Sequence, residues 1–156
     1  FCQKKGVNLE ILARRKSEEE KEFFHNILQN KKFIFHRQKD EFCSSYSIID
    51  KAEICISLNA SLGYESLARG NKTFFFNLND RNLNCSSFTK FGYPEKFQDE
   101  GFFWTNKFDP SKAMKNIDYI YNLSEKEWKS MSNEIIKKII VYDANNQFFQ
   151  ERLSQF

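Results

Sequence analysis

The sequence predicts an α/β fold in which a parallel sheet is flanked by helices. Short β-rich segments alternate with segments of helical periodicity, and two of the helices open with capping-box patterns. The links between these segments are short, as expected for parallel strands joined by crossover helices. The chain has 156 residues, 40% of them hydrophobic, which is enough for one domain with its own core.

The first half of the chain has the order β-α-β-α-β-α-β. Strands are expected at 7–13, 33–36, 53–58 and 72–77, and helices at 17–28, 44–52 and 62–69, after a short helix over 1–5 that Gly6 ends. The apolar run 53–58 is typical of a strand that is buried on both faces. The helix opened by Ser17 and Glu20 is expected to turn inward an apolar face of Phe23, Phe24, Ile27 and Leu28.

Residues 78–108 interrupt this order with an irregular, loop-like segment that carries the motifs FGYP (91–94) and GFFWTN (101–106). Its large aromatic side chains are expected to pack rather than to bind a ligand. The C-terminal part, 111–156, is predicted to be helical. One helix covers 111–121, Ser124 and Glu127 open a second with Trp128, Met131, Ile135 and Ile139 on one face, and a last helix follows Asp143.

Charge and cysteine content exclude several classes of protein. The formal net charge of +3 is too small and too mixed in sign for a nucleic-acid-binding domain. The four cysteines and two histidines have no metal-ligand spacing, and no apolar run approaches the roughly 20 residues of a membrane span. Free thiols without a signal peptide predict a cytoplasmic protein that holds no metal.

The segment 57–70 (SLNASLGYESLARG) carries the strongest signal for ligand binding. Ligands of open α/β sheets bind beyond the carboxyl ends of the strands, and Asn59 and Ser61 lie at such an end. They lead into a helix N-terminus, whose unpaired N–H groups and partial positive charge favour a phosphate. Ser61 adds a hydroxyl donor, Gly63 allows close approach, and Glu65 has a carboxylate suited to a ribose diol.

The same residues also have a purely structural interpretation. Ser61 then only caps the helix, Gly63 only permits tight packing, and Glu65 only favours the helix dipole. Because the chain contains neither a GxGxxG nor a Walker motif, the spacing alone leaves both interpretations open.

Three further polar residues lie near predicted strand ends. Arg14 follows the first strand, where a guanidinium would neutralise the charge of a leaving nucleotide; two solvated arginines before a helix are the alternative. His36 also ends a strand, although a lone histidine is more often a surface residue than a base. Lys72 is expected to be structural, because cations favour helix C-termini.

Several stretches resemble proteins of bacterial surface-carbohydrate and O-antigen biosynthesis. The run ICISLNASLGYESLARGNKTFFFN (54–77) is similar to that family's strand, Ser/Thr-Leu-Gly-Tyr-Glu turn, helix ending in Ala-Arg-Gly and second strand. The motifs FGYP and GFFWTN, the Trp of SEKEW and LARRKSEEEKEFF (12–24) resemble other parts, so the likeness covers roughly 7–130. Ala60 departs from the pattern, since related sequences often have a second Ser or another small polar residue there.

The resemblance implies the C-terminal, Rossmann-like half of a two-domain GT-B glycosyltransferase. Residues 1–156 would be its single donor-binding domain, a fragment whose missing N-terminal domain supplies the general base. Ser61 and the N–H groups of Leu62 and Gly63 would hold the donor phosphate, and Glu65 the ribose. The donor is then a nucleotide-sugar, and the acceptor is a carbohydrate or a lipid-linked acceptor. The resemblance implies no cofactor, no metal and no nucleic acid. It implies a protein in the cytoplasm, or one bound peripherally at the inner membrane face.

Two other functions stay open. The first is a different GT-B-like chemistry, that of a sugar-nucleotide epimerase or a polyol-phosphate transferase, which the acidic residues of the missing domain would discriminate. The second is a non-catalytic α/β interaction domain, which binds no nucleotide at all.

Overall fold

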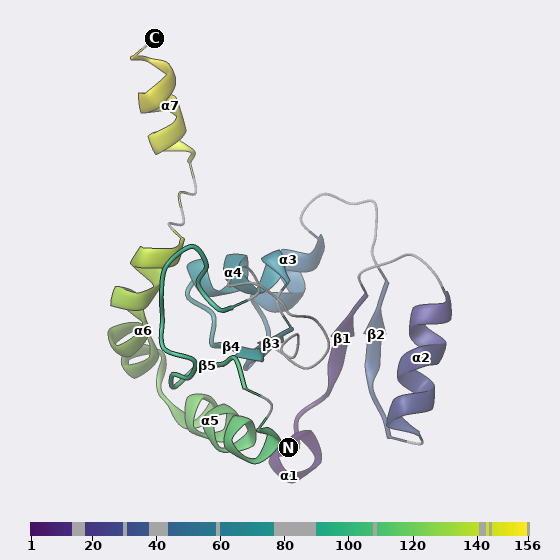
Figure 1. Ribbon diagram of the computed structural model, residues 1–156. Coiled ribbons are helices and arrows are strands. Elements are labelled where there is room, and N and C mark those ends of the chain that lie inside the picture. Colours follow the sequence, from purple (N-terminus) through teal and green to yellow (C-terminus); the bar gives the residue numbers. More distant parts are fainter. Residues whose placement is uncertain are drawn as a thin grey trace. The chain divides into compact units, whose positions relative to one another are not determined.

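A computed structural model describes residues 1–13, 18–29, 31–37, 44–58, 60–76, 90–107, 109–140, 143 and 145–155 (Figure 1). The chain divides into two compact units, unit 1 (Phe1–Lys51) and unit 2 (Ala52–Phe156). Both are built on parallel strands with flanking helices, which confirms the predicted α/β fold class and is consistent with a Rossmann-like fold. That residues 1–156 form a single domain stays a prediction.

In its described residues, unit 1 contains a two-stranded parallel ladder and three helices. Its elements are α1 (Cys2–Lys5), β1 (Glu10–Leu12), α2 (Glu18–Leu28), β2 (Ile34–His36) and α3 (Ser44–Ile49). Gly6 ends α1 in the left-handed conformation, with φ 70°, as the sequence predicts. All five elements agree with the sequence prediction in type and order, although the strands are shorter than predicted; Ser17 lies outside the described residues.

The apolar face predicted for α2 is only half right. Phe24 packs against Phe35 of β2, with ring centroids 6.3 Å apart, and Leu28 is half-buried. Phe23 and Ile27, however, are 57% and 59% exposed. A ladder of two strands is narrow, so it covers one stripe of the helix rather than the full apolar face.

Unit 2 contains a three-stranded parallel sheet in the order β3-β4-β5. Its elements are β3 (Cys55–Ser57), α4 (Ser61–Ala68), β4 (Thr73–Phe76), β5 (Trp104–Thr105), α5 (Pro110–Asn122), α6 (Glu125–Ile139) and α7 (Gln147–Leu153). The three C-terminal helices match the prediction. The short strand β5, by contrast, was predicted to be part of the irregular segment 78–108, because two residues carry no detectable periodicity.

Alternating side chains of β4 face opposite sides of this sheet. Thr73 and Phe75 point towards α4, since the Thr73 hydroxyl donates to the Ser66 hydroxyl over 3.1 Å. Phe74 points to the other face and has no exposed surface. In the view of Figure 1, α4 and α5 lie on opposite sides of the strands, as in a layered α/β fold.

Strand β3 is less buried than predicted. Ser57 is 6% exposed and faces α4, but Ile56 and Leu58 are 54% and 62% exposed. The expectation of burial on both faces is therefore wrong for the residues described. Among the strands that the structure describes, β3 lies at the edge of its sheet and β4 at the centre, which accounts for the exposure of β3.

Most aromatic side chains of the segment 90–107 pack in the core between α4 and the sheet, as predicted, but Tyr93 is 46% exposed. Phe91 is their common neighbour: its ring stacks on that of Trp104, with centroids 4.7 Å apart, and lies 4.9 Å from Phe75. Phe103, which has no exposed surface, meets Phe91 edge-on at 5.4 Å. This arrangement attaches the long connection between β4 and β5 to the sheet.

The corner between α5 and α6 is held by three polar contacts. Ser124 and Glu127 form the predicted capping box at the start of α6. Lys72, predicted to be structural, donates through Nζ to the carbonyl oxygens of Tyr121 and Leu123 at the end of α5. The Trp128 indole N–H donates to the Gly70 carbonyl over 3.1 Å, so α6 is fixed to the turn that precedes β4.

Replacing Trp128 by Phe is expected to lower the free energy of unfolding by about 2–3 kcal/mol, because it creates a cavity and leaves the Gly70 carbonyl without its donor. Urea denaturation followed by circular dichroism measures the change. Tyr119→Phe is the matched control, since Tyr119 is 47% exposed, and its change should stay within about 0.5 kcal/mol. Equal effects of the two substitutions would contradict the role assigned to Trp128.

Candidate functional site

The first turn of α4 lies at the carboxyl edge of the β3-β4-β5 sheet, where the sequence predicts ligand binding. Ala60 is the N-cap of α4, in an extended conformation (φ −93°, ψ 145°), and contributes no capping side chain. Ser57, at the end of β3, takes part of that role: its Oγ accepts the Ala60 N–H over 3.2 Å. The hydroxyl that the resemblance leads one to expect at position 60 is thus replaced by one three residues earlier.

The N–H groups of this first turn differ in whether they have a hydrogen-bond acceptor. The Gly63 N–H donates to the Ala60 carbonyl over 3.0 Å. The N–H groups of Ser61 and Leu62 have no hydrogen-bond acceptor among the residues that the structure describes. Of the two N–H groups assigned to phosphate, that of Leu62 therefore remains available, whereas that of Gly63 is engaged within the turn. The N–H of Ser61, which was not assigned, is a further available donor.

Gly63 is buried between α4 and the sheet. A Cβ atom on Gly63 would lie 2.3 Å from Ser57 Oγ and 3.1 Å from Phe75 Cε1. The missing side chain thus faces the strands, and close packing of α4 on β3 requires a glycine there. This close packing is what the structural interpretation of Gly63 expects. That the Gly63 backbone binds a phosphate stays a prediction.

Ser61 and Glu65 lie four residues apart in α4, so their side chains project from the same face of the helix. Ser61 is exposed and Glu65 is half-buried. That Ser61 contacts a phosphate and Glu65 a ribose stays a prediction.

A hydrogen-bond chain that the sequence did not reveal connects α4 to the end of β5. The Tyr64 hydroxyl accepts the Gly92 N–H over 3.1 Å, and burial raises the pKa of Tyr64. The residue before Gly92, Phe91, donates its N–H to Asn106 Oδ1 over 3.0 Å. The motifs FGYP and GFFWTN thus meet, and their polar atoms hold the loop against the first turn of α4.

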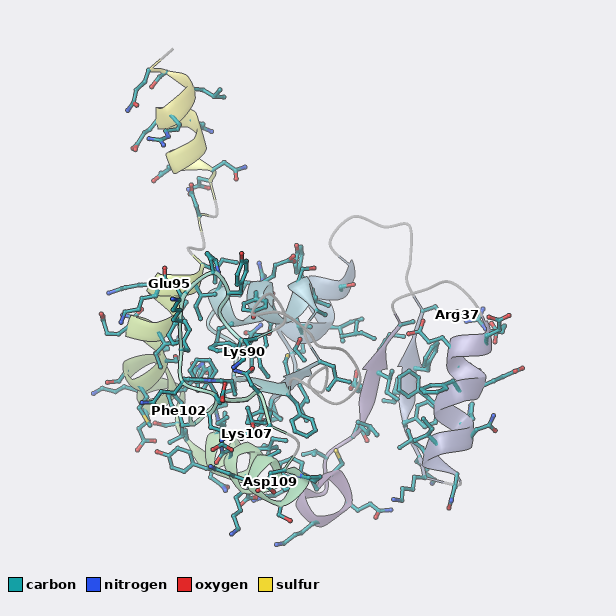
Figure 2. All side chains as sticks on the ribbon, viewed as in Figure 1. Arg37, Lys90, Glu95, Phe102, Lys107 and Asp109 are labelled. Carbon is teal, nitrogen blue, oxygen red and sulfur yellow. The ribbon has the colours of Figure 1, made fainter. Side chains whose placement is uncertain are left out.

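Near the end of β5, a lysine is paired with a carboxylate. Lys90 Nζ lies 2.7 Å from Asp99 Oδ1, and this hydrogen bond holds the pKa of the Asp99 carboxyl below its usual range. The Asp99 carbonyl in turn accepts the Asn106 N–H over 2.7 Å. Figure 2 labels Lys90 and Lys107, whose positive charges both act on this carboxylate. In the sequence, the only signal for these contacts of Asp99 is that two polar residues, Asp99 and Asn106, lie beside an aromatic motif.

Two of the predicted site residues, Arg14 and Asn59, lie outside the described residues. In unit 1, His36 is paired with Glu10, with 2.6 Å between Nε2 and Oε2. Its neighbour Arg37 forms an ion pair with Glu18 at the start of α2, where Figure 2 labels it. The side chains of His36 and Arg37 are thus held by carboxylates of their own unit.

Comparison with known proteins gives one match. A family model described as "putative O-antigen biosynthesis protein" matches residues 1–156. No curated protein and no solved structure matches the chain. Within the described residues, no helix is both long and apolar enough to span a membrane, and no group of three His, Cys, Asp or Glu side chains is arranged to hold a metal ion.

Replacing Gly63 by Ala is expected to lower the free energy of unfolding by about 1–3 kcal/mol, because the new methyl group overlaps Ser57. The double variant Ser57→Gly/Gly63→Ala removes the overlapping atoms and should be closer in stability to Ser57→Gly alone. Urea denaturation of all four proteins gives the coupling energy. Additive effects of the two changes would contradict the contact.

Proposed function

The chain belongs to this family of O-antigen biosynthesis proteins, and on that premise we propose that it is the nucleotide-sugar-binding part of a glycosyltransferase of surface polysaccharide synthesis. The observation that carries the proposal is the first turn of α4 at the carboxyl edge of a parallel sheet, where the N–H groups of Ser61 and Leu62 have no acceptor among the described residues. Its two open N–H groups and the positive end of the helix dipole favour the diphosphate of an activated sugar.

Each residue of this turn has a proposed task. The Ser61 hydroxyl and the N–H groups of Ser61 and Leu62 hold the donor phosphate, with Gly63 shaping the turn. The Glu65 carboxylate accepts hydrogen bonds from the ribose hydroxyls. Asn59 would border the same phosphate, and Arg14 would balance the charge of the leaving nucleotide.

In the proposed reaction an acceptor hydroxyl attacks the anomeric carbon of the sugar. The new C–O bond forms as the bond to the phosphate oxygen breaks, and the nucleotide leaves with the electron pair. The donors at the α4 N-terminus stabilise the charge that develops on the phosphate. The base that takes the acceptor proton is expected on another domain of GT-B type, and no metal or further cofactor is required. The acceptor in this proposal is a carbohydrate or a lipid-linked one, and the reaction takes place in the cytoplasm or at the inner face of the membrane.

Calorimetry with UDP, GDP, CMP and CDP tests the proposal, and at least one should bind with a Kd of about 1 mM or tighter. Ser61→Pro is the sharpest variant. Proline removes one N–H and the hydroxyl but suits the first position of a helix, and the extended conformation of Ala60 is compatible with a following proline. We expect unchanged thermal stability and about tenfold weaker nucleotide binding.

Ser61→Ala separates the hydroxyl from the backbone donor and should have a smaller effect than proline. Glu65→Gln should weaken the binding of nucleosides as well as of nucleotides. Glu53 is an exposed carboxylate of the same unit, and Glu53→Gln should change neither affinity. If no nucleotide binds at about 10 mM, or if Ser61→Pro and Glu65→Gln bind like the original chain, the donor site is refuted and a non-catalytic interaction domain is favoured.

A further inference from the structure

A groove runs across unit 1 at the amino ends of β1 and β2. One wall is α1 with the link Gly6–Leu9, and the other is the end of α2 with Gln29, Lys31 and Lys32. In Figure 1, α1 and the end of α2 lie near the lower ends of the two strands. The groove has a volume of about 580 Å³ beside α1, within the roughly 300–1,000 Å³ of small-molecule sites. It continues past Asn8 and Lys32 to the rings of His25 and Phe33, which lie 4.8 Å apart.

The polar lining of the groove combines two kinds of group. Gln3, Asn8 and Gln29 contribute amides, which can both donate to and accept from hydroxyl groups. Lys31 and Lys32 contribute two adjacent positive charges. In the described part of the chain, none of these five side chains forms a hydrogen bond or an ion pair.

The floor of the groove is apolar and fixed. Leu9 and Leu28 line it, and both are half-buried. The backbone of Leu9 is held by β2, since its carbonyl accepts the Ile34 N–H over 2.8 Å. The Lys31 N–H donates to the Leu28 carbonyl over 3.0 Å, which fixes the turn that carries the lysines. The groove therefore combines polar and apolar side chains on a backbone that these hydrogen bonds fix.

We propose that this groove binds an anionic monosaccharide, a sugar ring with a phosphate or a carboxylate. The lysines pair with the anion, the amides bind ring hydroxyls, and the leucines pack against the apolar face of the ring. This site is separate from the donor site proposed at α4. It lies in the other unit, at the amino rather than the carboxyl ends of strands, and needs no nucleotide.

Cys2, which lines the groove, is a direct probe of occupancy. Cys2 is partly exposed, and Cys55 in unit 2, which is also partly exposed, serves as the internal reference. The rate of alkylation of each cysteine by iodoacetamide is measured by peptide mass spectrometry in the 156-residue chain. Glucose 1-phosphate or glucuronate should slow alkylation of Cys2 and leave Cys55 unchanged. With a Kd of about 1 mM, 10 mM ligand slows the reaction about tenfold.

The two anionic sugars distinguish phosphate from carboxylate as the recognised group. Glucose and inorganic phosphate, each alone, should protect Cys2 less than the compound that joins them. Lys31→Gln/Lys32→Gln should abolish the protection, while Lys126→Gln/Lys138→Gln, which removes the same charge from α6, should preserve it.

Three outcomes would overturn the proposal: no protection of Cys2 by either anionic sugar, equal protection by inorganic phosphate alone, or equal loss in both double variants. The first outcome would show that the groove does not bind these sugars. Either of the other two would show only a general effect of charge on the reactivity of Cys2. None of these outcomes depends on nucleotide binding at α4, so the two proposals succeed or fail separately.

Discussion

The stacking of Phe91 on Trp104 is the contact on which the organisation of unit 2 depends. The two rings lie 18° from parallel, and Tyr64 of α4 stacks on Phe91 within 11° of parallel. A helix, a loop and a strand that are distant in sequence thus share one apolar cluster. Because Phe91 and Gly92 also donate their N–H groups to Asn106 and Tyr64, the cluster fixes the direction as well as the position of the loop.

The same cluster explains why α4 has a well-placed N-terminus. Gly63 lets the helix approach β3 closely, while Tyr64 on the next position anchors it to the loop. The two open N–H groups at Ser61 and Leu62 therefore sit on a short helix that is held from both sides. A donor that does not move on binding loses less entropy, so preorganisation of this kind favours affinity.

Periodicity and caps predicted most of the fold, because both are local. The order of helices and strands up to Phe76 and the capping box at Ser124 follow from neighbouring residues. The exposure of Ile56 and Phe23 did not follow, since burial depends on which strand is an edge and how wide a sheet is. The Tyr64–Gly92 contact joins residues 28 positions apart, and the sequence has no pattern that reports such a pair. For the site, the position of the helix terminus was predicted, but the substitution of Ser57 for a missing cap was not.

Lys72 has a consequence for engineering of the chain. The residues between α5 and α6 resemble an ordinary exposed loop, the kind of place chosen for tags, inserted domains or new termini. Yet the carbonyl oxygens of Tyr121 and Leu123 accept hydrogen bonds from the ammonium group of Lys72, which directly precedes β4. Opening the chain at this corner would separate a lysine from its acceptors, so permutation there would disturb the central strand of the sheet.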